Sequence, residues 1–139
     1  MTVGDFAKNN LGKLVDYDKM YDGQCVDVFR QGCQDINGIP HTGGVIGAKD
    51  LWLNYLKLPK EVEYFRRVKA SSKPKKGDYA IWDATSSNPY GHVALVLAPL
   101  DDYIIVMEQD GFKQDGAKLG IKTKSNLLGY LRPRKKIVI

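Results

Sequence analysis

The spacing of hydrophobic residues changes near the middle of the chain, from a helical period to a strand period. Val26, Phe29, Cys33 and Ile36 recur every three or four positions, as on the buried face of a helix. This pattern predicts a helix over residues 24–36. Two weaker helix candidates are residues 3–14 and 48–57.

The second half contains short apolar runs bounded by Gly, Pro, Asn or Asp, which is typical of strands. The predicted strands are residues 78–83, 92–98, 103–108 and 127–131. Helices followed by an antiparallel sheet describe an α+β protein. With 139 residues, 43% of them hydrophobic, we expect one domain with its own core, residues 1–139.

Composition argues against several classes of protein. No apolar run reaches the roughly 18 residues that a membrane helix needs, and the N-terminus lacks the basic-then-apolar layout of a secretory signal. The only two cysteines, Cys25 and Cys33, would lie about 12 Å apart along one helix, too far for a disulfide. The net charge of +5 would attract polyanions. Without a nucleic-acid motif, however, we expect no nucleic-acid partner, and we expect a monomer.

Cys25 is the first candidate for chemistry. It opens the predicted helix, whose positive end favours the reactive thiolate. Cys33 lies in the middle of the apolar stripe and is predicted to be a buried structural thiol. Gln24 precedes Cys25, and its side-chain amide could stabilise an oxyanion together with the Cys25 N–H. We therefore predict Cys25 as a nucleophile.

A thiol nucleophile needs a nearby imidazole, and the chain has two histidines. His41 lies in a Gly-rich loop and is predicted to be a surface residue. His92 lies at the mouth of an apolar strand and is the better candidate for a general base.

A hairpin between the second and third predicted strands would bring a carboxylate to this histidine. If Leu97 pairs with Tyr103, His92 lies opposite Glu108, with Cβ atoms about 5 Å apart. Glu108 would then accept a hydrogen bond from the imidazole and fix its tautomer. Asp110, two positions further on the same face, is the second candidate for this role.

Four aspartates surround Cys25 at a spacing close to that of a calcium loop. Asp16, Asp18 and Asp22 occupy loop positions 1, 3 and 7, and Asp27 occupies position 12. An EF-hand has Gly at position 6 and Glu at position 12, whereas this chain has Tyr21 and Asp27 there. From spacing alone, a metal loop and a solvated acidic turn remain equally open.

The ordered set of motifs resembles the CHAP family of cysteine- and histidine-dependent amidohydrolases/peptidases, especially the catalytic domains of phage lysins. The motifs are YDGQCVDVFRQ, GDYAIWD, YGHVALVL and VMEQDG. The resemblance implies a papain-like fold in which N-terminal helices pack on an antiparallel sheet. It implies Cys25 as nucleophile, His92 as general base and acid, Glu108 as the orienting residue and Gln24 at the oxyanion position. Where many members have Asn, this chain has Asp110.

The resemblance also implies a structural Ca²⁺. Some lysins of this family bind calcium through four acidic residues and one backbone carbonyl around the cysteine. The corresponding positions are Asp16, Asp18, Asp22, Asp27 and Met20.

The implied activity is hydrolysis of an amide or peptide bond in bacterial peptidoglycan, by an N-acetylmuramoyl-L-alanine amidase or an endopeptidase. Such an enzyme would be phage-encoded and either released by lysis or carried in the virion. Two alternatives remain: an NlpC-like peptidase, and a non-catalytic calcium-dependent module that binds the wall or belongs to the virion. Four aromatic residues could line a peptide groove, and we expect one or two of them to touch substrate: Trp52, Tyr55, Trp82 and Tyr90.

Overall fold

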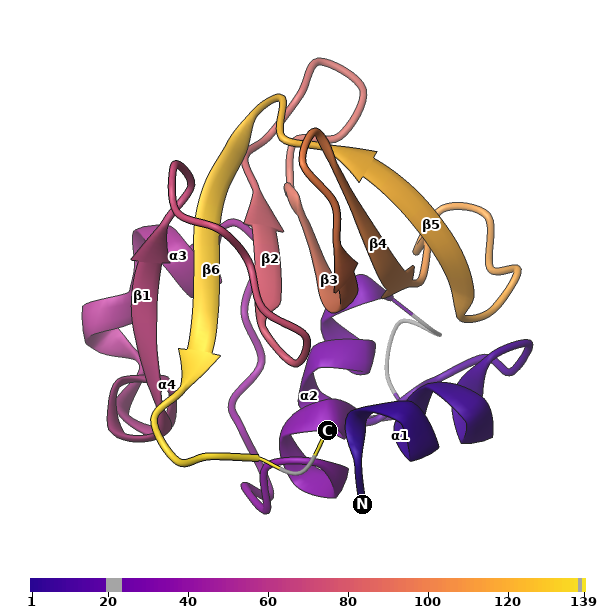
Figure 1. The fold of residues 1–139 in the computed structure, drawn as a ribbon. Coiled ribbons are helices and arrows are strands. Elements are labelled where there is room, and N and C mark those ends of the chain that lie inside the picture. Colours follow the sequence, from indigo (N-terminus) through magenta and orange to yellow (C-terminus); the bar gives the residue numbers. More distant parts are fainter. Residues whose placement is uncertain (20–23, 138) are drawn as a thin grey trace.

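Helices and an antiparallel sheet form two layers in the computed structural model, which describes residues 1–19, 24–137 and 139 (Figure 1). The helices are α1 (Val3–Asn10), α2 (Cys25–Asp35), α3 (Asp50–Leu53), the 3₁₀ turn η1 (Tyr55–Lys57) and α4 (Pro59–Tyr64). The strands are β1 (Phe65–Lys69), β2 (Tyr79–Trp82), β3 (His92–Pro99), β4 (Tyr103–Glu108), β5 (Lys118–Thr123) and β6 (Leu127–Pro133). The predicted α+β class is confirmed.

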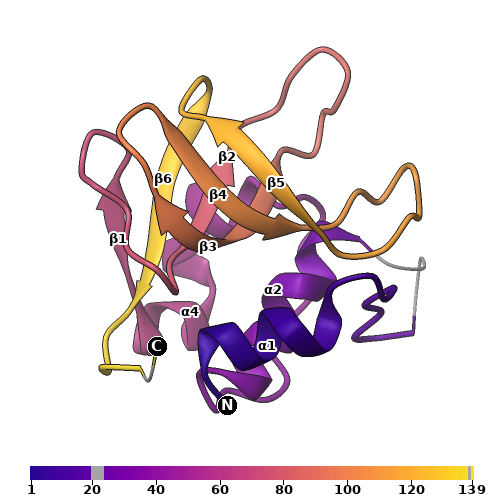
Figure 2. The same cartoon turned by 45° about the vertical axis from the view of Figure 1, so that its right-hand side comes forward.

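The sheet has six strands in the order β1-β6-β2-β3-β4-β5, and every pairing is antiparallel. It curls, so that β5 at one end returns toward β2 and β6 (Figure 2). The indole N–H of Trp82 on β2 donates to the carbonyl oxygen of Thr123 at the end of β5, at 3.1 Å. The curl gives the sheet an inner and an outer face that bury different side chains.

The main core lies between the sheet and α2, because α2 has one apolar face. Its Phe29 ring packs edge-on against Tyr79 at 4.9 Å and lies 6.0 Å from Phe65. Gly32 faces the same ring, and a Cβ at that position would overlap the Tyr79 hydroxyl. The absence of a side chain at Gly32 therefore lets the helix approach the sheet closely.

The inner face of the curl holds a second, smaller core. Alternation along the strands sends Tyr79 and Ile81 toward the helices and Ala80 and Trp82 to the inner face. The residues of this second core are Val68, Ala80, Trp82, Ala94, Val96, Ile104, Val106 and Tyr130. His92 is the register partner of Trp82 and shares its face.

Several predicted elements are confirmed with small changes of boundary. The predicted helix 24–36 is α2, with Gln24 and Ile36 as its caps, and the four predicted strands are β2, β3, β4 and β6. The segment 48–57 divides into α3 and η1 instead of forming one helix. Among the described residues, none of the helices combines the length and apolar character needed to cross a bilayer.

Three elements were not predicted: α4, β1 and β5. Strand β5 alternates in burial, but its apolar residues Leu119 and Ile121 are 59% and 71% exposed. Its inward positions carry Lys118, Gly120 and Lys122. Because its polar residues face inward and its apolar residues face outward, β5 has no apolar run from which the sequence could predict a strand.

Candidate active site

A groove with a volume of about 1170 Å³ opens where the N-terminal end of α2 meets the ends of β3 and β4. Cys25, His92 and Glu108 all line it. Its walls are completed by residues 44–48, by the β2–β3 loop and by the segment from residue 109 to β5. The structure thus brings the three residues singled out from the sequence to one site.

Cys25 is the first residue of α2, as predicted, and its side chain is partly exposed. The helix begins here because Asp27, at its third position, accepts the backbone N–H of Gln24 at 2.8 Å. Cys25 therefore lies at the end of α2 where the helix dipole carries its partial positive charge. Cys33 is fully buried, and both cysteines are free thiols, as predicted.

His92 and Glu108 are joined by a hydrogen bond, Nε2 to Oε1, of 2.8 Å. The predicted contact between the imidazole and this carboxylate is therefore present. The imidazole also lies 5.8 Å from the Trp82 ring, which limits its orientation. Because Nε2 is engaged by Glu108, Nδ1 is the nitrogen left for the Cys25 thiol.

The strand register that led to this prediction is wrong by two positions on the side of the site and by three positions between the bulge and the turn. The predicted hairpin, which paired Leu97 with Tyr103, places Leu95 opposite Ile105. In the structure Leu95 pairs with Met107 instead. A β-bulge next to Leu97 changes the register along the hairpin. A shift of two positions keeps each side chain on its original face. The histidine and the glutamate are therefore diagonal neighbours instead of direct partners, still within reach of each other.

The two partners shift each other's pKa. Burial acts to lower the pKa of His92, but hydrogen bonds with Cys25 and Glu108 and the charges of both residues raise it to about 9. Burial acts to raise the pKa of Glu108, but hydrogen bonds from His92 and Lys122 and their charges lower it to about 2. The imidazolium and the carboxylate are thus both favoured at neutral pH.

Gln24 lines the groove beside Cys25, as its predicted role requires. Asp110 also lines the groove, but its Oδ1 accepts the backbone N–H groups of Phe112 and Lys113 at 2.8 and 3.4 Å. Among the described hydrogen bonds, none joins Asp110 to His92. The structure therefore brings Glu108, and not Asp110, to the imidazole.

Gln109 is a residue that the sequence did not single out. Its side chain is fully buried and accepts the backbone N–H of Val15 at 2.8 Å. It donates to the carbonyl oxygens of Val15 at 2.8 Å and of Gln24 at 2.9 Å. Gln109 thereby ties the end of β4 to the residue before Cys25. A single Gln belongs to no periodic pattern, so only its place directly after Glu108 could have indicated this role.

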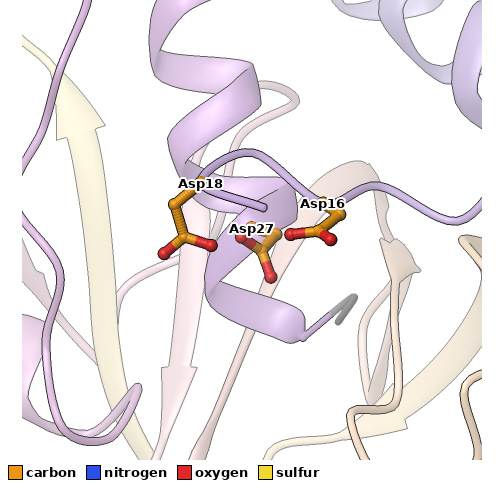
Figure 3. A group of neighbouring side chains, drawn as sticks. All are labelled: Asp16, Asp18 and Asp27. Atoms are coloured by element: carbon orange, nitrogen blue, oxygen red, sulfur yellow. The ribbon is translucent and has the colours of Figure 1, made fainter. Parts of the chain in front are cut away.

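Three carboxylates near α2 point toward one another: Asp16 and Asp18 from the preceding loop, and Asp27 from the first turn of the helix (Figure 3). One oxygen from each lies within 4.8 Å of the others. Oδ1 of Asp16 is buried without a hydrogen-bond partner among the described residues. Burial, together with the charges of Asp18 and Asp16, raises the pKa of Asp27 to about 6 against the opposing hydrogen bonds from backbone N–H groups.

A set of hard oxygen donors with one unpartnered oxygen fits a cation such as Ca²⁺. The cluster could therefore hold a metal ion. The two remaining predicted ligands, Met20 and Asp22, lie outside the described residues. Arg30 neutralises part of the charge, since it pairs with Asp18 at 3.0 Å.

Two of the four predicted aromatic residues line the groove, namely Trp82 and Tyr90. Tyr55 is buried, and its hydroxyl donates to the carbonyl oxygen of Phe65. Two large, strongly exposed apolar side chains at the groove were not predicted: Phe112, which is 67% exposed, and Ile46, which is 91% exposed. Exposed apolar residues in loops follow no period, and so the sequence pattern does not reveal them.

Comparison with known proteins gives a family match that includes Cys25, His92 and Glu108. The CHAP domain family matches residues 15–110. Among solved structures, Ly7917, crystallised with the hydrolyzing product of MDP, aligns with a TM-score of 0.70 and 19% identity over 96% of this chain and 63% of that chain. The wild-type endolysin LysIME-EF1 aligns with a TM-score of 0.68 and 20% identity over 98% of this chain and 66% of that chain.

At these identities the likeness to both structures shows the fold. The chain spans slightly less than two thirds of the length of either structure. No curated protein sequence matches it.

Replacing Gln109 with Leu should destabilise the protein by about 3 kcal/mol, because the backbone groups of Val15 and Gln24 would lose their buried partner. Urea unfolding measures the change. Gln31→Leu is the control, since Gln31 is only partly buried and bonds a single side chain, Asp35; its effect should stay within about 0.5 kcal/mol. Equal stability of both variants would contradict the clamping role of Gln109.

Replacing Cys25 with Ala should lower the pKa of His92 from about 9, because the hydrogen bond and negative charge of Cys25 both stabilise the imidazolium. NMR titration of the His92 ring measures this directly. Cys33→Ala is the matched control, since Cys33 is buried in the main core. An unchanged His92 titration in Cys25→Ala would show that the two side chains do not interact.

Proposed function

The chain belongs to the CHAP domain family, and we propose that it hydrolyses an amide or peptide bond of bacterial peptidoglycan through a Cys25–His92–Glu108 mechanism. The observation that carries the proposal is the hydrogen bond of 2.8 Å between His92 and Glu108 beside a partly exposed Cys25. All three line one open groove. A thiol, an imidazole and a carboxylate in this order form the arrangement of an activated nucleophile.

In the proposed reaction, the Cys25 thiolate attacks the carbonyl carbon of the scissile bond. The oxyanion that develops accepts hydrogen bonds from the Cys25 N–H and the Gln24 side chain. His92 then donates a proton to the leaving amine, and a thioester links the acyl group to Cys25. His92 next takes a proton from water, and the water oxygen attacks the thioester. The C–S bond breaks, the acid is released, and the Cys25 thiolate and protonated His92 of the starting state are restored.

Glu108 would act through the imidazole. Its bond to Nε2 fixes the ring orientation and leaves Nδ1 directed to the thiol. Its charge also helps to keep His92 protonated before the attack, in keeping with the raised pKa of about 9. An NlpC-like enzyme would often have a second histidine in this position; here a glutamate occupies it.

The groove is suited to a peptide. Its volume of about 1170 Å³ is large enough for a peptide segment, and Trp82, Tyr90 and Phe112 offer apolar surface along it. A peptide with both apolar and acidic groups would find apolar contacts and the side chains of Lys113 and Lys118 there.

We further propose that the acidic cluster binds Ca²⁺. Asp16, Asp18 and Asp27 would supply carboxylate oxygens, and Met20 and Asp22 are expected to add a backbone carbonyl and a carboxylate. The ion would supply the positive charge that the cluster lacks and would hold the loop against the first turn of α2.

Cys25→Ala should abolish hydrolysis of purified cell walls, with a loss on the order of 10⁴-fold or more. Turbidity loss and release of free amino groups without reducing sugar are the measurements, and the new chain ends identify the bond. Cys33→Ala is the matched control and should retain activity. A Cys25→Ala variant that lyses walls at the wild-type rate would refute the mechanism and favour a non-catalytic module.

Adding Ca²⁺ to metal-free protein at about 100 times its Kd should stabilise it by about 2.7 kcal/mol, which raises the melting temperature by several degrees. Asp16→Asn should remove most of this gain, because it withdraws a charged ligand from the cluster. Asp102→Asn, in the exposed β3–β4 turn, should keep it. No calcium-dependent change in the wild-type melting temperature would refute the calcium proposal.

A further inference from the structure

The carboxylate of Glu108 is held by a second element as well as by His92. Oε1 of Glu108 accepts hydrogen bonds from His92 Nε2 at 2.8 Å and from Lys122 Nζ at 2.9 Å. Lys122 lies on β5, the edge strand beside β4. One oxygen is thus fixed by two donors from two different strands.

The register explains why this contact is not an ordinary cross-strand pair. Glu108 lies directly opposite Lys118, whereas Lys122 lies opposite Ile104. Yet Lys118 pairs with Asp115 at 3.2 Å, and Glu108 pairs with the lysine four positions further along β5. The Glu108 side chain therefore leans along the inner face of the sheet.

Gly120 makes this orientation possible. It lies on the same face between the two lysines, and a Cβ placed on it would overlap Oε2 of Glu108. The backbone of Gly120 does not have a positive φ. Glycine is therefore required here for space and not for conformation, because any side chain would push the carboxylate out of position.

We propose that Gly120 and Lys122 are positioning residues of the Cys25–His92–Glu108 site: Gly120 provides the space for the Glu108 carboxylate, and Lys122 fixes the oxygen that meets His92. The proposal rests on the function proposed above. An exposed ion pair would contribute little, but the Glu108 side chain is only 10% exposed and is shared with the imidazole. Loss of Lys122 would leave His92 as the one donor to that oxygen among the described residues.

Among the described residues, the charged groups that act on Glu108 are His92 from β3 and Lys122 from β5, with Lys118 of β5 also near. Cys25 on α2 acts on His92. Burial alone would raise the pKa of Glu108, and it stays low because His92 and Lys122 both donate to it and carry positive charge. Removing the Lys122 charge should therefore raise this pKa and make the carboxylate easier to protonate as the pH falls.

The first experiment compares Lys122→Met, Lys122→Arg and a control, Lys69→Met, at an exposed position on β1 at the far end of the sheet. The ¹³C signal of the Glu108 carboxyl group, assigned with Glu108→Gln, is titrated by NMR. Lys122→Met should raise the Glu108 pKa by about one unit or more. Lys122→Arg should keep this pKa close to the wild-type value, and Lys69→Met should leave it unchanged.

The same variants are then tested on cell walls. Lys122→Met should lower kcat/KM by about tenfold, and the loss should grow toward low pH because protonated Glu108 no longer orients the imidazole. Lys122→Arg should recover most of the rate. A Glu108 pKa and a pH profile that are unchanged in Lys122→Met would overturn the role of Lys122.

Gly120→Ala tests the space requirement, with Gly43→Ala as control, since a Cβ at Gly43 meets no atom within 4 Å. Gly120→Ala should lower kcat/KM by about tenfold or more and lower the His92 pKa, because the carboxylate is displaced from the ring. Gly43→Ala should change neither. Wild-type titration and rate in a folded Gly120→Ala variant would overturn the proposal for that residue.

Different measurements would refute the positioning role of Gly120 and Lys122 and the proposed hydrolytic function. The NMR titrations of Glu108 and His92 need no hydrolysis, so they test the positioning role by itself. Activity that survives in Cys25→Ala would instead refute the proposed function and leave the titrations unaffected. If Gly120→Ala does not fold, the Lys122 variants still test whether β5 positions the Glu108 carboxylate.

Discussion

The site depends on how the helical layer is joined to the sheet, because its thiol and its imidazole come from different layers. Cys25 lies on α2 and His92 on β3. The buried Gln109 side chain joins the layers at this point, with three hydrogen bonds to Val15 and Gln24. Its neighbour Glu108 reaches the other side of the sheet, to His92. Two consecutive residues, Glu108 at the end of β4 and Gln109 directly after it, therefore set the positions of both reacting groups.

Charge imposes the second constraint on the same region. The first turn of α2 carries Asp27, whose carboxylate accepts the N–H groups of Gln24 and Tyr17 at 2.8 and 3.1 Å. It thus both starts the helix and folds back the preceding loop. The cost is three carboxylates within 4.8 Å, which Arg30 only partly neutralises. Burial with nearby like charge raises the pKa of Asp27 to about 6. A cation would relieve this repulsion without disturbing the helix start.

Much of the candidate site could be predicted because it depends on local sequence patterns, or on contacts that an error of two positions in strand register does not remove. The apolar stripe of α2 located Cys25 at the helix start, and the strand pattern located His92 at the beginning of β3. The predicted contact with Glu108 is present even though the register is wrong by two positions, since an even shift preserves the face. Neither the helical nor the strand period reveals Gln109, because its backbone partners lie 94 and 85 residues away in the sequence.

Strand β5 was missed for a related physical reason. Hydrophobic patterns locate a strand by the apolar residues that face its core, but the inner face of β5 carries Lys118, Gly120 and Lys122 beside the groove. Its apolar residues face outward and remain largely exposed. The strand therefore lacks a core-facing stripe at the place where its side chains contact a carboxylate of the site. The inward face of β5 is polar and includes one glycine. This face gives no apolar pattern in the sequence, and it is also the face that contacts the Glu108 carboxylate.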